Sequence, residues 1–285
     1  MKPAPFAFRA PSNLAGALDA LAEYGDGARV LAGGQSLVPL MNLRMVRPDA
    51  LISINGCADL DYVRVEDGRL AVGARVRQAQ AEEMELVQRE CPLLAEALPF
   101  CGGQANRNRA TVCGSLAHAD PLAELPAVAL ALDAEFEVAS KAGARRVAGK
   151  DFFVSDLTNC MAPGEMLAAV RVDRAQPGEK HAFLEMSNRR HGFAVAGVAV
   201  RLRLGADGRC SFARIAMIGA GQTARVAPAE GALVGARIDD AAIASAMGAA
   251  RAAVRPPSDA HADADYRRHV LGVLLGRALK RALAR

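Results

Sequence analysis

The chain is 285 residues long, which suffices for one large domain or two domains of ordinary size. With 52% hydrophobic and 23% charged residues, it has the composition of a folded protein with a sizeable core. Its net charge of +4 is scattered along the chain and only 4% of its residues are aromatic, so a nucleic-acid-binding function is disfavoured.

The first 175 residues show alternating helix and strand patterns. A helix is expected to begin after Ser12, a candidate N-cap, and to end near Gly25. Asp120 and Pro121 are typical of the N-cap and first position of a short helix, which Pro126 would restart. The other expected elements are strands at 29–32, 51–54, 70–74, 134–139 and 167–172 and helices at 78–89 and 92–99.

The polar stretch 176–180 breaks this pattern and is interpreted as a linker. Beyond it, strands are expected at 194–204 and 211–218, joined by a hairpin turn at Asp207-Gly208. Helices are expected at 228–235, 239–254 and 264–283. The last of these ends in basic residues, which suit the helix dipole and are interpreted as a solvated face rather than a docking patch.

The cysteines and histidines show no metal-site spacing. No two of the six cysteines form a C-x-x-C pair, and the five histidines are scattered, so we expect reduced thiols and no metal in this chain. Residues 1–9 contain no apolar stretch of the signal-peptide kind, and no run of about 18 apolar residues occurs. We therefore expect a cytoplasmic protein without a membrane span.

Two glycine-bearing segments are the most informative part of the sequence. The first, 32–37, reads Ala-Gly-Gly-Gln-Ser-Leu, and the second, 111–121, reads Thr-Val-Cys-Gly-Ser-Leu-Ala-His-Ala-Asp-Pro. Glycine lets the backbone approach a ligand closely, and successive free backbone N–H groups form an anion-binding nest. Two such loops could hold one diphosphate from two sides, which indicates a dinucleotide cofactor. The first segment by itself is also compatible with a plain turn, and it lacks the Gly-Lys-Ser/Thr ending of a P-loop.

A third segment imitates a different motif. Gly219 to Ala224 follows an expected strand and matches the dinucleotide-binding pattern G-x-G-x-x-A. That pattern needs a helix to begin there, whereas Pro228 interrupts the sequence soon afterwards. We interpret this segment as a turn at the end of a strand, with NAD binding as the weaker alternative.

Other candidate residues stay ambiguous on sequence alone. His118, inside the second segment, could approach a flavin or be a polar loop residue. The basic and aromatic group 189–193 fits a surface turn or a position near the cofactor. No Gly-x-Ser-x-Gly elbow or other nucleophile motif is present.

Taken together, the two glycine-bearing segments closely resemble those of the FAD-binding medium subunit of the molybdenum hydroxylases. This is the family of xanthine dehydrogenase and aerobic carbon monoxide dehydrogenase. Four further stretches agree with the resemblance, which spans nearly the whole chain: 107–108, 163–167, 189–190 and 265–267.

The resemblance implies an α+β protein. Residues 1–175 would form the two-subdomain FAD-binding fold of the vanillyl-alcohol oxidase type, with subdomains at about 1–57 and 58–175. Residues 180–285 would form a small α+β C-terminal domain with a three-stranded sheet. The implied partners are a large molybdopterin-binding subunit and a small subunit with two [2Fe–2S] clusters, in a heterotrimer that usually dimerises.

The resemblance also implies which residues bind FAD. Residues 32–36 would wrap the diphosphate through backbone N–H groups, and 111–115 would form the opposing loop. Leu167 would pack against the flavin or adenine region. The implied cofactor-binding residues are Leu31, Ala32, Gly33, Gly34, Gln35, Ser36, Leu37, Cys101, Thr111, Val112, Cys113, Gly114, Ser115, His118, Glu124, Leu167 and Glu185.

Several of these positions depart from the family pattern. Cys113 replaces the first of two usual glycines and fits only where φ is negative, while Ser115 replaces an asparagine or aspartate. Glu124 stands where an aspartate commonly touches the cofactor, and Cys101 where some relatives have an aromatic residue. Glu185 stands where some relatives place a lysine near the flavin, and a carboxylate there would disfavour the anionic reduced flavin.

The implied function is electron transfer by a flavoprotein subunit. The substrate would be hydroxylated at molybdenum in another subunit, and FAD would collect single electrons from the clusters and pass them in pairs to an external acceptor. This chain then needs no catalytic acid or base. Two alternatives stay open: a self-sufficient FAD-dependent oxidase or reductase, with His118 or His191 as its acid–base group, and a non-catalytic structural flavoprotein subunit.

Overall fold

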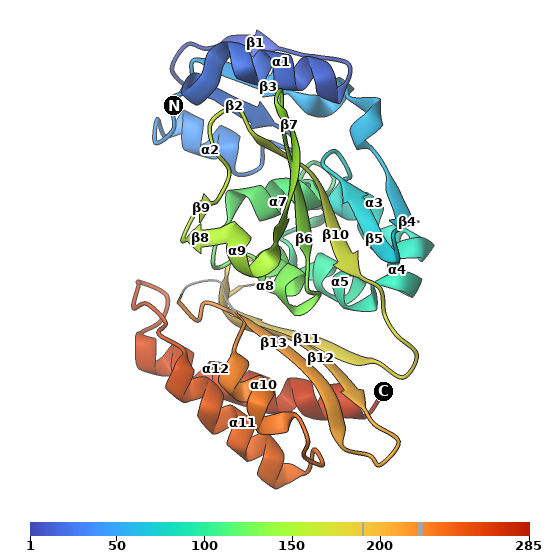
Figure 1. Ribbon diagram of the computed structural model, residues 1–285. Helices are drawn as coiled ribbons and strands as arrows, with labels where there is room; N and C mark the ends of the chain where they lie inside the picture. Colours follow the sequence, from blue (N-terminus) through green and yellow to red (C-terminus); the bar gives the residue numbers. More distant parts are fainter. Residues whose placement is uncertain (190, 222–224) are drawn as a thin grey trace.

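The computed structural model describes residues 1–189, 191–221 and 225–285. Three α+β layers are stacked along the length of the molecule, with the N-terminus in the first layer and the C-terminus at the third (Figure 1). None of the helices in these described ranges combines the length and apolarity that crossing a bilayer requires.

The first layer is a small parallel sheet with the strand order β1-β3-β2. Helix α1 begins at Asn13, whose side chain accepts a hydrogen bond from Gly16 N at 2.8 Å, one residue beyond the predicted cap at Ser12. It ends at Gly25, as predicted, where φ is +51°. The elements of this layer are β1 (Ala7–Arg9), α1 (Leu14–Tyr24), η1 (Gly25–Gly27), β2 (Ala28–Leu31), α2 (Leu37–Asn42), β3 (Ala50–Ser53), η2 (Ile54–Gly56) and η3 (Ala58–Leu60).

The second layer is a five-stranded antiparallel sheet with the order β4-β5-β10-β6-β7, packed against helices. Asp67 and Gly68, both with positive φ, form the tight turn between β4 and β5. The elements are β4 (Val63–Glu66), β5 (Arg69–Gly73), α3 (Gln78–Glu83), α4 (Glu85–Glu90), α5 (Pro92–Ala97), η4 (Leu98–Phe100), α6 (Gln104–Arg107), α7 (Val112–His118), α8 (Glu124–Ala131), β6 (Glu135–Ser140), β7 (Gly143–Ala148), α9 (Gly149–Phe152), β8 (Phe153–Ser155), β9 (Thr158–Asn159) and β10 (Met166–Asp173).

Sequence patterns misplaced two helices of this layer. The helix predicted at 78–89 is broken at Met84, whose extended backbone separates α3 from α4. Asp120 does not cap a helix: its Oδ1 accepts a hydrogen bond from Leu122 N at 2.8 Å in a local turn, and α8 begins at Glu124. Pro126 then lies in the first turn of α8, where its missing N–H costs no intrahelical hydrogen bond.

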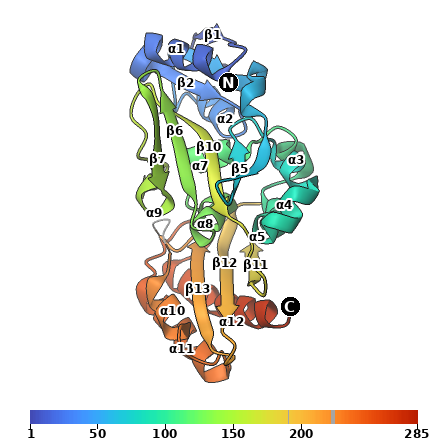
Figure 2. The ribbon, with the colours of Figure 1, turned by 45° about the vertical axis from the view of Figure 1, so that its right-hand side comes forward.

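The third layer is the antiparallel sheet β11-β12-β13, with three helices on its outer face (Figures 1 and 2). Its elements are β11 (Lys180–Ser187), β12 (Ala194–Leu204), β13 (Cys210–Ile218), α10 (Ala227–Leu233), α11 (Asp240–Ala253) and α12 (Ala264–Leu283). Alternate residues of the sheet join two different cores: Val198 packs towards the outer helices, whereas Phe183 and Ala199 join the core of the second layer. Both faces of β12 are therefore covered, which explains its long apolar run.

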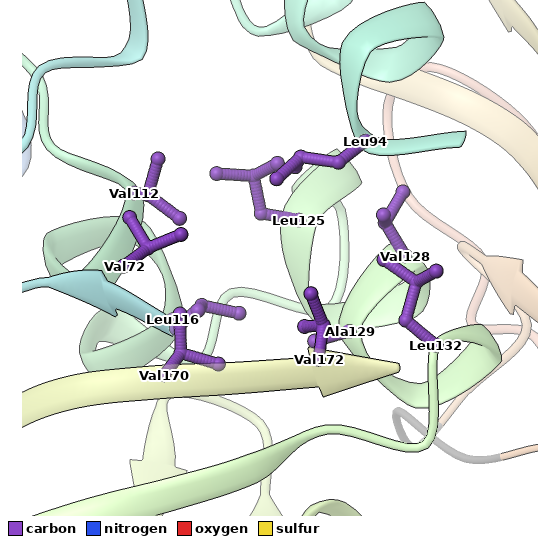
Figure 3. Close-up of a pocket in the computed structure, with 10 residues that line it drawn as sticks. All are labelled: Val72, Leu94, Val112, Leu116, Leu125, Val128, Ala129, Leu132, Val170 and Val172. Carbon is purple, nitrogen blue, oxygen red and sulfur yellow. The ribbon is translucent and has the colours of Figure 1, made fainter. Parts of the chain in front are cut away.

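The core of the second layer is closely packed. A small gap of about 10 Å³ lies between α7, α8 and the strands β5 and β10, and only aliphatic side chains line it (Figure 3). Leu116 and Leu125 approach it from the two helices, and Val170 from β10. A gap of this size without polar groups is a packing defect rather than a ligand site.

A buried ion pair ties the third layer to the second. Arg201 of β12 is 2% exposed; its Nε and Nη2 donate to the Glu179 carboxylate at 2.8 and 3.0 Å, and its Nη1 donates to Ala131 O at 3.2 Å. The guanidinium thus satisfies a carboxylate before β11 and the last carbonyl group of α8. Removing one partner of such a pair leaves an uncompensated buried charge.

We therefore expect Arg201→Met to lower the free energy of unfolding by about 3 to 5 kcal/mol. Urea denaturation of the intact chain measures this change. Lys150→Met is the matched control, because the Lys150 side chain is 78% exposed, and it should change stability by no more than about 0.5 kcal/mol. Equal effects of the two substitutions would contradict a structural role for the Arg201 pair.

Candidate cofactor-binding site

The first glycine-bearing segment presents a run of free backbone N–H groups. Residues 33–36 connect β2 to α2, with Gly34 at φ +73°. Within the described residues, the amides of 33–36 donate to no protein acceptor. Further along the chain, Val38 N donates to Gly34 O at 3.0 Å, which closes the turn that leads into α2. The Gln35 side chain folds back and donates from Nε2 to Gly33 O at 3.2 Å. Four successive amides without an acceptor form a nest that suits an anion.

The two glycine-bearing segments lie against each other. A Cβ atom at Gly33 would lie 2.3 Å from Arg109 O and 2.7 Å from the Cα atom of Ala110, so only glycine permits this backbone contact. Arg77 holds the arrangement, because its guanidinium donates to Arg109 O and to the Asn55 side chain. The structure therefore brings together the segments that the sequence analysis paired.

The second segment differs from the loop that was predicted. Thr111 is the N-cap of α7, and its Oγ1 accepts from Gly114 N at 2.9 Å. The amides of Val112 and Ser115 donate to Val76 O at 3.1 Å and Thr111 O at 3.2 Å. Of residues 112–115, Cys113 alone has an amide without an acceptor in the described structure. The backbone just before this segment packs against Gly33 of the first one, and the segment itself begins helix α7. It does not form a second run of free amides.

Cys113 is compatible with this geometry. As a residue of α7 it has negative φ, and its side chain is buried in the core, where Sγ donates to Val72 O at 3.5 Å. Burial raises the pKa of this thiol to about 12, so it stays protonated. The second segment retains glycine at position 114, and this position requires it. A Cβ atom at Gly114 would lie 2.6 Å from the capping Thr111 Oγ1.

A second group of implied residues meets where the second layer packs on the third. Cys101 follows η4, Glu124 is the first residue of α8, and Glu185 lies on β11. Cys101 and Glu124 are both buried, and the Cys101 thiol donates to Ala97 O at 3.8 Å. Burial raises the pKa of Glu124 to about 7. In the order of the stack, α2 lies above α7, and α8 lies between α7 and the C-terminal sheet (Figure 1).

The remaining implied residues occupy different environments. Leu31 and Leu37 flank the first segment at the end of β2 and the start of α2. Leu167 is buried on β10, beside an irregularity in its pairing with β6. His118 is half-buried in the last turn of α7, and the Ser115 hydroxyl makes no hydrogen bond within the described structure.

Sequence reasoning missed a cleft beside this region. It has a volume of about 230 Å³ and is lined by Asp120, Pro121, Leu122, Asp156, Leu157, Gly219, Gly221 and Pro257. Gly219 N donates to Pro121 O at 3.1 Å, which fixes the end of β13 against the segment after α7. Two of the motifs contribute to its lining, Asp120 and Pro121 from one and Gly219 and Gly221 from the other, but no local pattern shows that they meet, because the cleft forms only where distant segments come together.

The other motifs lie as follows. Gly219 and Gly221 have positive φ at the end of β13, which agrees with a strand-end turn, while Gln222 to Ala224 lie outside the described residues. Of the group 189–193, Arg190 also lies outside them, and Phe193 is 69% exposed just before β12. Within the described ranges, no three His, Cys, Asp or Glu side chains gather to hold a metal ion.

Two family models together match most of the chain. The model described as the FAD binding domain in molybdopterin dehydrogenase matches residues 4–174, and the CO dehydrogenase flavoprotein C-terminal domain matches residues 181–282. The chain is 39% identical to the 6-hydroxypseudooxynicotine dehydrogenase complex subunit alpha of Paenarthrobacter nicotinovorans, over 100% of this chain and 97% of that protein.

Solved structures agree over the whole chain. Carbon monoxide dehydrogenase from Hydrogenophaga pseudoflava matches with a TM-score of 0.96 at 34% identity, covering 100% of this chain and 99% of the matched one. Quinoline 2-oxidoreductase from Pseudomonas putida 86 matches with a TM-score of 0.93 at 34% identity and the same coverage. These matches confirm the α+β fold with its FAD-binding and C-terminal parts, the cofactor FAD and the oxidoreductase class. The chain belongs to the FAD-binding medium subunits of the molybdenum hydroxylase family.

Proposed function

We propose that this chain transfers electrons within a molybdenum hydroxylase complex. It receives them from [2Fe–2S] clusters of a small partner subunit and passes them to an external acceptor, while a large molybdopterin-binding subunit oxidises the organic substrate. The relatives support this proposal, because they are named as subunits or medium chains of dehydrogenases. We also propose a dimer of heterotrimers and a division into domains 1–175 and 180–285, with subdomains at about 1–57 and 58–175.

The observation that carries the proposal is the open run of amides at 33–36. These N–H groups fit the oxygens of a diphosphate, and the absence of a Cβ at Gly33 keeps them against the start of α7. We propose that the unused Cys113 amide and Ser115 hydroxyl donate to the same cofactor from the other side. FAD, when bound, supplies the redox chemistry by accepting single electrons and releasing pairs. The protein residues bind and orient it.

We expect Gly33→Ala to weaken FAD binding by on the order of tenfold or more, equivalent to at least about 1.4 kcal/mol, because the added Cβ would push the two segments apart. Fluorescence titration of the flavin-free chain with FAD measures the affinity. Gly248→Ala is the matched control, since a Cβ there on α11 meets no atom within 4 Å, and it should leave the affinity unchanged. Unaltered binding by a folded Gly33→Ala chain would contradict this placement of the diphosphate.

The electron-transfer role is tested by comparing the FAD-loaded chain with the purified complex. Both are treated with carbon monoxide, caffeine, nicotine and glyceraldehyde, chosen from the names of relatives. We expect the flavin absorbance to bleach in the complex with a compound that the complex oxidises, and to stay unchanged in the chain alone. Bleaching of the chain alone would support a self-sufficient oxidase. Turnover of the complex without any flavin reduction would support a structural subunit.

A further inference from the structure

Arg77 lies where the first layer meets the second. Its extended backbone precedes α3 and forms an isolated antiparallel β-bridge with Thr111, the N-cap of α7. On one side of this bridge, Gln78 N donates to Ala110 O at 2.9 Å. The backbone of Arg77 is therefore fixed beside the second glycine-bearing segment, although the two are more than 30 residues apart in the chain.

The guanidinium of Arg77 joins both sides of the proposed diphosphate site. It donates to the Asn55 side chain, which belongs to η2 of the first layer, and to Arg109 O in the second layer. The same Arg109 O lies where a Cβ atom at Gly33 would approach to 2.3 Å. One hydrogen bond thus separates Arg77 from the carbonyl group against which the run of free amides at 33–36 begins.

Arg77 has no acidic partner within the described residues. Its two hydrogen bonds go to uncharged acceptors, whereas the neighbouring Arg75 forms an ion pair with Asp61 at 3.4 Å. The exposed Arg109 side chain likewise forms no ion pair with a described acid. Burial, and then the charges of Arg109 and Arg75, lower the pKa of Arg77, and Asp61 opposes them only weakly.

The chain on both sides of the two glycine-bearing segments contains no acid. Residues 28–48 and 97–119 include several arginines but neither aspartate nor glutamate. A partly buried cation without a counter-ion is costly, because burial removes part of its hydration. An anion bound to the amides of 33–36 would offset this cost.

We propose that Arg77 is a positioning residue for the FAD diphosphate and supplies the positive charge that balances it. The guanidinium holds the Arg109 carbonyl group and Asn55 in place, so it fixes the backbone on which the amides of 33–36 rest. Its remaining N–H donors and its charge face no acid of the described protein. The inference rests on the part of the proposed function that places the diphosphate at 33–36, and is independent of the electron-transfer role.

Fluorescence titration of the flavin-free chain with FAD, at a series of salt concentrations, tests this role. We expect Arg77→Met to weaken FAD binding by on the order of tenfold or more at low salt, because a charge-assisted interaction is lost. The difference from the wild type should shrink as salt rises, since salt screens the lost attraction. Arg77→Lys keeps the charge without the planar fork, so it should bind FAD with intermediate affinity and retain the salt dependence.

Two further ligands separate the diphosphate from the flavin. ADP contains a diphosphate without a flavin, and riboflavin contains the flavin without a phosphate. We expect Arg77→Met to weaken the binding of ADP, measured by its displacement of FAD, and to leave the binding of riboflavin unaltered. Arg75→Met is the matched control, because it removes an equal charge from the same stretch that Asp61 already neutralises. It should change the FAD affinity and its salt dependence much less.

The outcomes distinguish this inference from the placement of the cofactor. Unaltered FAD binding by a folded Arg77→Met chain would overturn it, and so would a loss that is equal at every salt concentration and spares ADP, which marks a purely structural role. If Gly33→Ala weakens binding and Arg77→Met does not, the role of Arg77 fails and the diphosphate placement stands. If neither weakens it, the placement itself fails. Circular dichroism verifies folding, and Arg77→Gln replaces Arg77→Met if the latter does not fold.

Discussion

The complete burial of α8 is the constraint on which the rest of the structure depends. All eight of its residues are buried, because the C-terminal strands β12 and β13 and the helices α5 and α7 pack around it. A helix that is apolar on all sides needs such an environment. Its last carbonyl group is satisfied by Arg201 from the third layer, so the helix also joins the two halves of the chain. Its first residue, Glu124, brings an ionisable group into the same dry junction.

Backbone contact, in contrast, shapes the proposed diphosphate site at residues 33–36. Gly33 lies against the backbone of Arg109 and Ala110, and the result is a run of amides with no acceptor in the described protein. Such groups are rarely left free in a folded chain unless water or a ligand satisfies them. At the start of α7, three of the four amides of residues 112–115 already donate to acceptors of the protein. The two segments therefore have unequal roles, because the first presents free donors and the second positions them.

The departures from the family pattern are explained by the same packing. Cys113 is tolerated because α7 sends its side chain into the core, while Gly114 retains the position where a side chain would collide with the cap. Glu185, where some relatives have lysine, forms no ion pair with a described cation, and its Oε2 is buried without a hydrogen-bond partner. Burial, followed by the charge of Glu124, raises the pKa of this carboxyl to about 8.

The sequence by itself determined the family, the α+β class, the cofactor and most helices and strands, because short motifs and apolar periodicity are local properties. The assignment of individual residues to the cofactor stays a prediction. Tertiary structure alone decided that residues 112–118 form a helix, that Asp120 forms a turn instead of a cap, and that β12 and β13 cover α8. It also decided the meeting of Cys101, Glu124 and Glu185. Burial and pairwise electrostatics depend on segments far apart in the chain, and no local pattern encodes those distances.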